Sequence, residues 1–69
     1  MNKFGENLKN IRKANNLNQK QFARLMNTTQ QRISEWECGQ VEPSLYNIIK
    51  IMQGLNTPFE DLADGLIEQ

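Results

Sequence analysis

The stretch from Asn18 to Gly39 constrains the fold most, because it is typical of two helices that are each too short to be stable alone. Asn18 and Gln21 have the spacing of a capping box, which predicts the start of the first helix. Thr28 or Thr29 begins the second helix, and Gly39 ends it as a C-terminal glycine. The apolar residues that the two helices must share are spaced three apart within each: Phe22, Leu25, Ile33 and Trp36. Only a near-perpendicular crossing lets two elements this short share one core.

The chain before this stretch predicts one further helix. Phe4, Leu8 and Ile11 fall at i, i+4 and i+7, which places them on one helical face. Asn15 and Asn16 end that helix, since asparagine tolerates the left-handed backbone conformation that closes helices.

After Gly39 the sequence predicts two more helices. Ser44 is the expected cap of the first, and Gly54 weakens its last turn by about 1 kcal/mol relative to alanine. Thr57 and Pro58 have the order of a cap and a first helical residue, and they open the second. The residues expected on the apolar faces of these two helices are Leu45, Ile48, Ile49, Met52 and Leu55, then Phe59, Leu62, Ala63, Leu66 and Ile67. Because no strand periodicity is present, the expected fold class is all-α, in one five-helix domain over residues 1–69.

Cysteine and histidine usage argues against several classes of protein. The chain has one cysteine, Cys38, and no histidine, so neither an intrachain disulfide nor a zinc site is expected. Without histidine or a recognisable nucleophile setting, an enzyme is not expected either. No apolar run approaches the roughly 18 residues of a membrane span, and the N-terminus lacks the apolar stretch of a signal peptide. We therefore expect a cytoplasmic protein without a metal, a cofactor or a small-molecule ligand.

The charges are divided unevenly between the two halves of the chain, although the net charge is zero. Residues 1–34 carry seven basic residues and one acidic residue, a net charge of +6. Residues 35–69 carry one basic and seven acidic residues, a net charge of −6. Such asymmetry favours one surface that binds a polyanion. The alternative is that both sets of charges are simply solvated surface.

Three segments together resemble the repressor and Cro family of phage and bacterial helix-turn-helix transcription factors. They are LNQ at 17–19, TTQQ at 28–31 and PSLYNIIKIMQGLNTPFEDL at 43–62, with an isoleucine at 33, a glutamate at 37 and a glycine at 39 between the last two. The resemblance implies a five-helix DNA-binding domain with a central helix-turn-helix. It also implies a homodimer bound to a pseudo-palindromic operator, with half-sites about 10 bp apart. The partner expected is therefore double-stranded DNA, and the third helix would enter its major groove.

The resemblance also assigns DNA contacts to particular residues. By resemblance, Gln30, Gln31 and Thr29 are expected to contact bases and Gln19 a phosphate. Arg32, which has no counterpart in the matched pattern, is a further expected base contact, and the further expected phosphate contacts are Asn18, Ser34 and Lys20. A glutamine amide offers one acceptor and two donors, so it can pair bidentately with adenine N6 and N7. The alternative for Gln30 and Gln31 is an ordinary solvated helix surface.

Two glutamates require separate interpretations. Glu37 and Arg12 match a family pair that is largely buried and ionic, and we expect a structural role for both. Glu35 would be repelled by phosphate but could accept from a cytosine N4 amine, and solvated surface is the expected role.

The sequence leaves the use of the fifth helix open. Its expected dimer contacts are Phe59, Leu62, Leu66 and Ile67. The same residues could bind a separate protein or complete the core. For the whole domain, three kinds of regulator share this sequence pattern: a repressor, an antitoxin-type autoregulator and a restriction-control protein. The second hypothesis is a protein-interaction module with weak or no DNA binding, which Glu42 in the loop at 40–43 favours.

Overall fold

Residues 3–66, which the computed structural model describes, form five helices and no strand, so the all-α prediction is confirmed. The helices are α1 (Lys3–Ala14), α2 (Gln19–Leu25), α3 (Gln30–Cys38), α4 (Leu45–Leu55) and α5 (Phe59–Leu62). Within residues 3–66, no helix has the length and apolar character needed to cross a membrane.

Side-chain caps fix the starts of three helices. The Oδ1 of Asn18 accepts from the N–H of Gln21 at 2.7 Å, and the Oε1 of Gln21 accepts from the N–H of Asn18 at 2.8 Å. The predicted capping box is therefore present. Thr29, rather than Thr28, caps α3 by accepting from a backbone N–H three residues on, and Ser44 caps α4 in the same way.

Residues in the left-handed backbone conformation end or follow α1, α3 and α4. Gly39 ends α3 with φ 83°, and Asn16 follows α1 with φ 61°, as the sequence predicted. Asn56 ends α4 with φ 50°, a signal that the sequence analysis did not use. Asparagine tolerates this conformation better than most residues.

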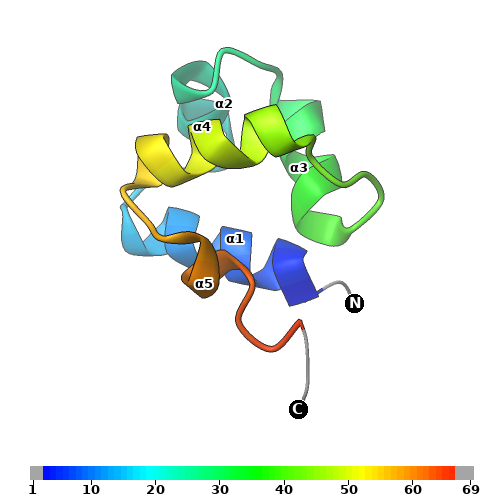
Figure 1. Ribbon diagram of the computed structural model, residues 1–69. Helices are drawn as coiled ribbons and strands as arrows, with labels where there is room; N and C mark the ends of the chain where they lie inside the picture. Colours follow the sequence, from blue (N-terminus) through cyan, green and yellow to red (C-terminus); the bar gives the residue numbers. More distant parts are fainter. Residues whose placement is uncertain (1–2, 67–69) are drawn as a thin grey trace.

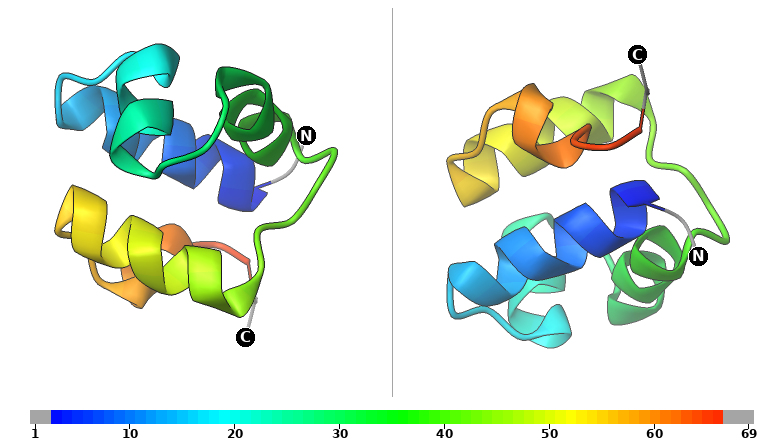
Figure 2. Two further views of the ribbon diagram at one scale, coloured as in Figure 1. Left: turned by 90° about the horizontal axis from the view of Figure 1, so that it is seen from above. Right: turned by 90° about the horizontal axis from the view of Figure 1, so that it is seen from below.

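The helices are arranged around α1 and the helix-turn-helix pair. α2 packs against α3, and α1 contacts both α3 and α5 (Figure 1). Figure 2 shows α1, α2 and α3 in one layer and α4 and α5 in the other, with the loop between α3 and α4 joining them at one edge. α1 is thus the element that connects the helix-turn-helix to the C-terminal helix.

Every helix contributes to one buried apolar cluster. Its members among residues 3–66 are Leu8, Phe22, Ala23, Met26, Ile33, Trp36, Ile51, Leu55 and Leu62. Burying a large apolar side chain contributes about 1.5–3 kcal/mol, so this cluster is the main stabilising feature of a short chain. Trp36 is 2% exposed, which confirms the core role expected for it.

Three residues expected on the apolar faces of α2 and α4 are instead exposed. Leu45 is 73%, Leu25 52% and Ile49 45% exposed. Successive helical residues are about 100° apart, and the buried side of α4 is centred on Ile51 and Leu55. Leu45 and Ile49 therefore lie beyond its edge. The sequence predicted too wide an apolar face for both α2 and α4.

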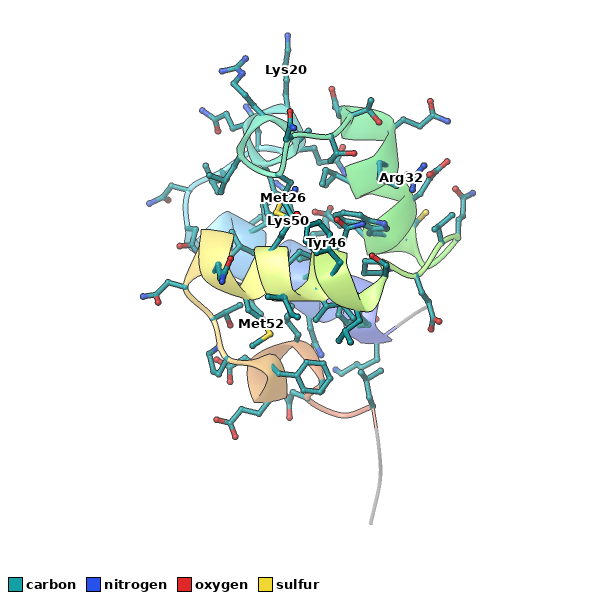
Figure 3. All side chains as sticks on the ribbon, turned by 45° about the horizontal axis from the view of Figure 1, so that its top comes forward. Lys20, Met26, Arg32, Tyr46, Lys50 and Met52 are labelled. Atoms are coloured by element: carbon teal, nitrogen blue, oxygen red, sulfur yellow. The ribbon has the colours of Figure 1, made fainter. Side chains whose placement is uncertain are left out.

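Lys50 joins α4 to the end of α2. Its Nζ donates to the carbonyl of Met26, the C-cap of α2, at 2.8 Å. The same Nζ lies 5.6 Å from the ring centroid of Tyr46, and Figure 3 shows the three side chains close together. A cation is favourable at a helix C-terminus. The one basic residue after residue 34 is therefore used within the fold.

α5 is shorter than the sequence predicted. Pro58 is its N-cap rather than its first residue, and the predicted Thr57 cap is wrong by one position. The Nδ2 of Asn7, on α1, donates to the carbonyls of Leu62 and Asp64, both at 2.8 Å. These bonds give hydrogen-bond donors to carbonyl groups that have no partner within α5. The positive φ of Gly65, 78°, then turns the chain. The prediction of a helix reaching Leu66 is wrong, and Ile67 lies outside the described residues.

The backbone of α1 lies close to that of α3 at Gly5. A Cβ at this position would lie 2.2 Å from the carbonyl oxygen of Glu37 and 2.9 Å from that of Trp36. Only glycine lets the two backbones come this near. No sequence pattern indicated this role for Gly5.

Candidate nucleic-acid interface

The starts of α2 and α3 meet at a polar hollow on the surface. Its lining residues, which we call the amide hollow, are Gln19, Gln30, Gln31, Ser34, Glu35 and Gln40. Gln30, Gln31 and Ser34 are exposed, and four of the six lining residues carry a side-chain amide. Amides and hydroxyls both donate and accept, which is the chemistry that base edges in a major groove require.

A buried ion pair lies beneath the amide hollow. The Nε of Arg12 donates to the Oε2 of Glu37 at 2.6 Å, and its Nη2 donates to the Oε1 at 3.1 Å. The side chains are 6% and 4% exposed. The Nη1 of Arg12 also donates to the carbonyl of Leu17 at 2.7 Å, in the turn before α2. The pair therefore holds α1, α3 and the approach to α2 together, with the bidentate geometry that suits a guanidinium.

The ion pair extends to the surface through Gln19. The Nε2 of Gln19 donates to the Oε1 of Glu37 at 3.2 Å, and the Nε2 of Gln30 donates to the Oε1 of Gln19 at 3.5 Å. Since a carboxylate only accepts, Glu37 fixes which way the Gln19 amide faces. Gln19 in turn directs the amino group of Gln30 inward, so Gln30 presents its amide oxygen outward.

Glu35 makes a second cluster on α3. It accepts from the Nε2 of Gln31 at 3.4 Å and pairs with the Nε of Arg32 at 3.5 Å. Arg32 does not line the amide hollow, although it is half-exposed beside it. Two of the four residues expected to contact bases thus share one carboxylate.

The other predicted contact residues are placed differently. The side-chain oxygens of Asn18 and Thr29 accept backbone N–H groups in their caps. Neither Asn18 nor Lys20 lines the hollow, and Lys20 extends outward from α2 (Figure 3). Ser34 lines both the amide hollow and an adjoining hollow that includes Lys9 and Cys38.

Gln40 is a lining residue that sequence reasoning missed. Its backbone N–H donates to the carbonyl of Glu35 at 3.0 Å, after Gly39 has turned the chain. This is the bond that a Schellman ending makes between the second residue past the helix and its last turn. The glycine that predicted the end of α3 was therefore also the signal that the next residue folds back toward the hollow.

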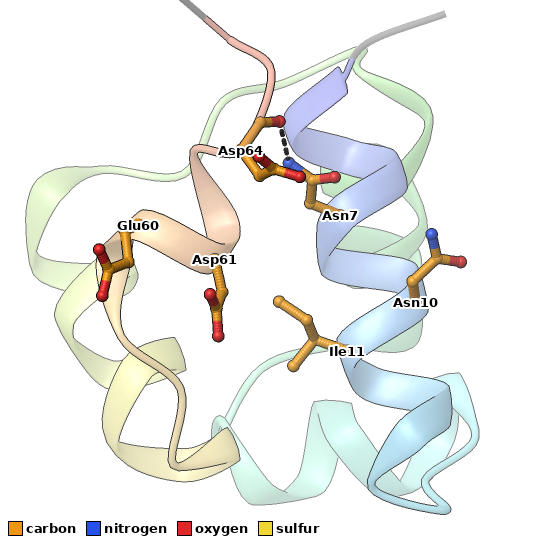
Figure 4. Close-up of a pocket in the computed structure, with 6 residues that line it drawn as sticks. All are labelled: Asn7, Asn10, Ile11, Glu60, Asp61 and Asp64. Carbon is orange, nitrogen blue, oxygen red and sulfur yellow. Dashed lines mark hydrogen bonds between the residues drawn. The ribbon is translucent and has the colours of Figure 1, made fainter.

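The acidic residues of α5 and the turn after it border a separate hollow. Figure 4 shows Glu60, Asp61 and Asp64 near α1, where Asn7, Asn10 and Ile11 complete the lining. Within residues 3–66, no group of three or more His, Cys, Asp or Glu side chains is placed to hold a metal ion. The uneven charge of the sequence thus corresponds in part to an acidic surface between α1 and α5.

A comparison with known families matches residues 8–62 to the helix-turn-helix family. The chain belongs to this helix-turn-helix family. The resemblance to the repressor and Cro type, found from the sequence, is therefore confirmed. The matched range contains all of α2, α3 and α4, together with every residue of the amide hollow.

A solved structure supports the same assignment. The restriction-modification controller protein C.AhdI from Aeromonas hydrophila is 33% identical, with a TM-score of 0.81. The similarity covers 87% of this chain and 91% of that one. No curated protein matches the chain. In this helix-turn-helix protein, α3 is the second helix of the motif, which supports a DNA-binding transcription regulator.

Proposed function

We propose that this protein is a sequence-specific transcriptional regulator that binds duplex DNA and reads the major groove with α3. The observation that carries the proposal is the amide hollow, in which Gln30 and Gln31 are exposed at the start of the second helix of the motif. Gln30 is held through Gln19 by a buried ion pair, so its amide is oriented before DNA arrives. A contact that is already oriented loses less entropy on binding.

Each predicted contact residue has a role in this proposal. Gln30 and Gln31 pair with base edges, the methyl group of Thr29 packs on a thymine methyl, and Arg32 contacts a base beside them. The remaining residues position the duplex through its phosphates: Gln19, Asn18, Ser34 and Lys20. The acidic hollow between α1 and α5 stays away from the backbone, because carboxylates repel phosphates.

The proposal predicts a defined binding motif. Selection from a pool of random duplex DNA, at two salt concentrations, is expected to enrich a two-fold symmetric sequence with half-sites about 10 bp apart. Gln30→Ala and Gln31→Ala should each weaken binding by about 1–3 kcal/mol and relax the motif at separate positions. Asn10→Ala is the matched control, since it removes an exposed amide from α1 outside the amide hollow. Failure to enrich any sequence at low salt would contradict the proposal and favour a protein-interaction module.

A repressor is the role that the family resemblance favours. The similarity to C.AhdI favours a second candidate, control of a restriction-modification system. Both roles use the same DNA interface. A reporter gene placed behind the selected motif distinguishes repression from activation.

The homodimer of this proposal uses a smaller surface than the sequence suggested. Leu62 is fully buried, so it completes the core and cannot contact a partner. Phe59 and Leu66 are 51% and 44% exposed and border a hollow with Phe4, Glu42, Pro43 and Ile48. We place the dimer contact at this hollow. Apolar surface at the core of an interface is what sustains homodimers.

Phe59→Lys is therefore expected to shift the protein from dimer to monomer in sedimentation equilibrium. Binding to the full palindrome should fall by at least tenfold, because the second half-site no longer adds to the first. Tyr46→Ser is the control, since Tyr46 is an exposed aromatic residue that does not line this hollow. An unchanged oligomeric state in Phe59→Lys would place the dimer contact elsewhere.

A further inference from the structure

Among residues 3–66, Glu35 is the one acidic residue that lines the amide hollow. Residues three and four apart on a helix are neighbours on its surface, and Glu35 contacts both Arg32 and Gln31 at these spacings. Its side chain is 26% exposed, against 52% for Arg32. The carboxylate therefore forms part of the wall of the hollow instead of extending into solvent.

This contact determines what Gln31 presents to DNA. Because a carboxylate only accepts, Gln31 turns one of its two amide N–H groups toward Glu35 and leaves its Oε1 and the other N–H free. The Gln31 end of the amide hollow then offers two neighbouring acceptors, the Oε1 of Gln31 and the carboxylate of Glu35, beside one amide donor. In the major groove, adenine and cytosine present amino donors, whereas guanine and thymine present acceptors.

Cytosine suits this arrangement better than adenine. Cytosine presents only the N4 amino group, whereas adenine also presents N7, an acceptor that would face an acceptor-only carboxylate. Arg32, held beside Glu35, supplies donors for the guanine that pairs with that cytosine. The neighbouring acceptor and donor thus match the two bases of a single C·G pair.

We propose that Glu35 is a specificity-determining residue, which makes the Gln31 end of the amide hollow select cytosine in a C·G pair. The inference rests on the proposed function and assigns one base of its recognition sequence. The negative charge of Glu35 lowers the affinity for any DNA, because phosphates repel it. The same carboxylate disfavours guanine or thymine in place of the cytosine, because these bases present acceptors to it.

The test compares the wild-type protein with Glu35→Gln and Glu60→Gln in the same selection from random duplex DNA. Glutamine keeps the shape of glutamate but adds a donor, so Glu35→Gln should lose the preference for cytosine by about 5- to 150-fold, the range of one good base contact. The other motif positions should be unchanged. Glu60→Gln removes the same charge from an exposed residue that lines neither the amide hollow nor the hollow of the proposed dimer contact, and its motif should equal that of the wild type.

The outcomes separate this inference from the proposed function. If Glu35→Gln keeps the wild-type preference for cytosine, as Glu60→Gln should, Glu35 does not select a base and the inference is overturned. A wild-type motif without a preferred cytosine in each half-site overturns the inference alone. If the wild-type protein enriches no motif, the proposed function fails and the inference fails with it.

Discussion

Glu37→Ala is expected to lower the free energy of unfolding by about 3–5 kcal/mol, because it leaves the Arg12 guanidinium buried without its carboxylate. A chain of this length has a total stability of only about 3–10 kcal/mol, so a large fraction of the molecules should unfold at growth temperature. Urea unfolding followed by far-UV circular dichroism measures the change. A loss below about 1 kcal/mol would show that the pair contributes no more than a surface salt bridge.

The matched control replaces both partners. Arg12→Met with Glu37→Met leaves no uncompensated charge, and such replacements are often neutral or stabilising. We expect most of the lost stability to return, apart from the carbonyl of Leu17, which loses its donor. Gln19 also loses its acceptor in this variant. DNA binding should therefore stay weaker, with relaxed base preference at Gln30, even though the protein is folded.

Gly5→Ala is expected to destabilise the protein by about 3 kcal/mol or more, at the upper end of overpacking effects. The added Cβ would lie 2.2 Å from the carbonyl oxygen of Glu37, and that obstacle is backbone, which cannot rotate away. Helix propensity acts in the opposite direction by about 1 kcal/mol. The clash should push α1 away from the end of α3. Thermal unfolding measures the net change in stability.

Gly54→Ala provides the comparison, because it makes the same chemical change where space allows it. Its Cβ would lie 3.3 Å from the Cδ2 of Leu25, a half-exposed side chain that can move aside. Stabilisation of up to about 1 kcal/mol is expected from the gain in helix propensity. Equal stability of the two variants would show that the contact at Gly5 relaxes without cost.

The sequence predicted those parts of the fold that depend on local interactions. The Asn18 capping box and the Gly39 helix end involve residues within five positions of one another, and both are present in the structure. The pairing of Ile33 and Trp36 with the core followed from helical spacing alone. Such features are determined by residues that are close together in the sequence.

The parts that the sequence did not predict depend on long-range contacts. The length of α5 is set by Asn7, more than fifty residues away in the chain, whose amide occupies the carbonyls at its end. The need for glycine at position 5 arises from the backbone of Glu37. The exposure of Leu45 is likewise decided by which side of α4 packs on the rest of the protein. No local pattern contains this information.

The candidate site divides in the same way. The resemblance to the repressor and Cro family indicated Gln30 and Gln31, and both line the amide hollow. It did not indicate that Glu35 would bind the amide of Gln31, or that Gln40 would fold back beside it. The first is a contact between two exposed or half-exposed side chains of α3, and the second is a backbone bond that forms after Gly39 turns the chain.

The alternation of buried and exposed positions along α3 has a consequence for evolution. Ile33, Trp36 and Glu37 are buried, while the residues that face the hollow contribute little to the core. If α3 reads DNA as proposed, new operators can therefore be acquired by exchanging surface residues of α3 at small cost to stability. Gln19, on α2, is more constrained, because it bonds to the buried carboxylate of Glu37 as well as to Gln30. In the proposed interface, the base preference should thus change most slowly at the base assigned to Gln30 and faster at the bases assigned to residues further along α3.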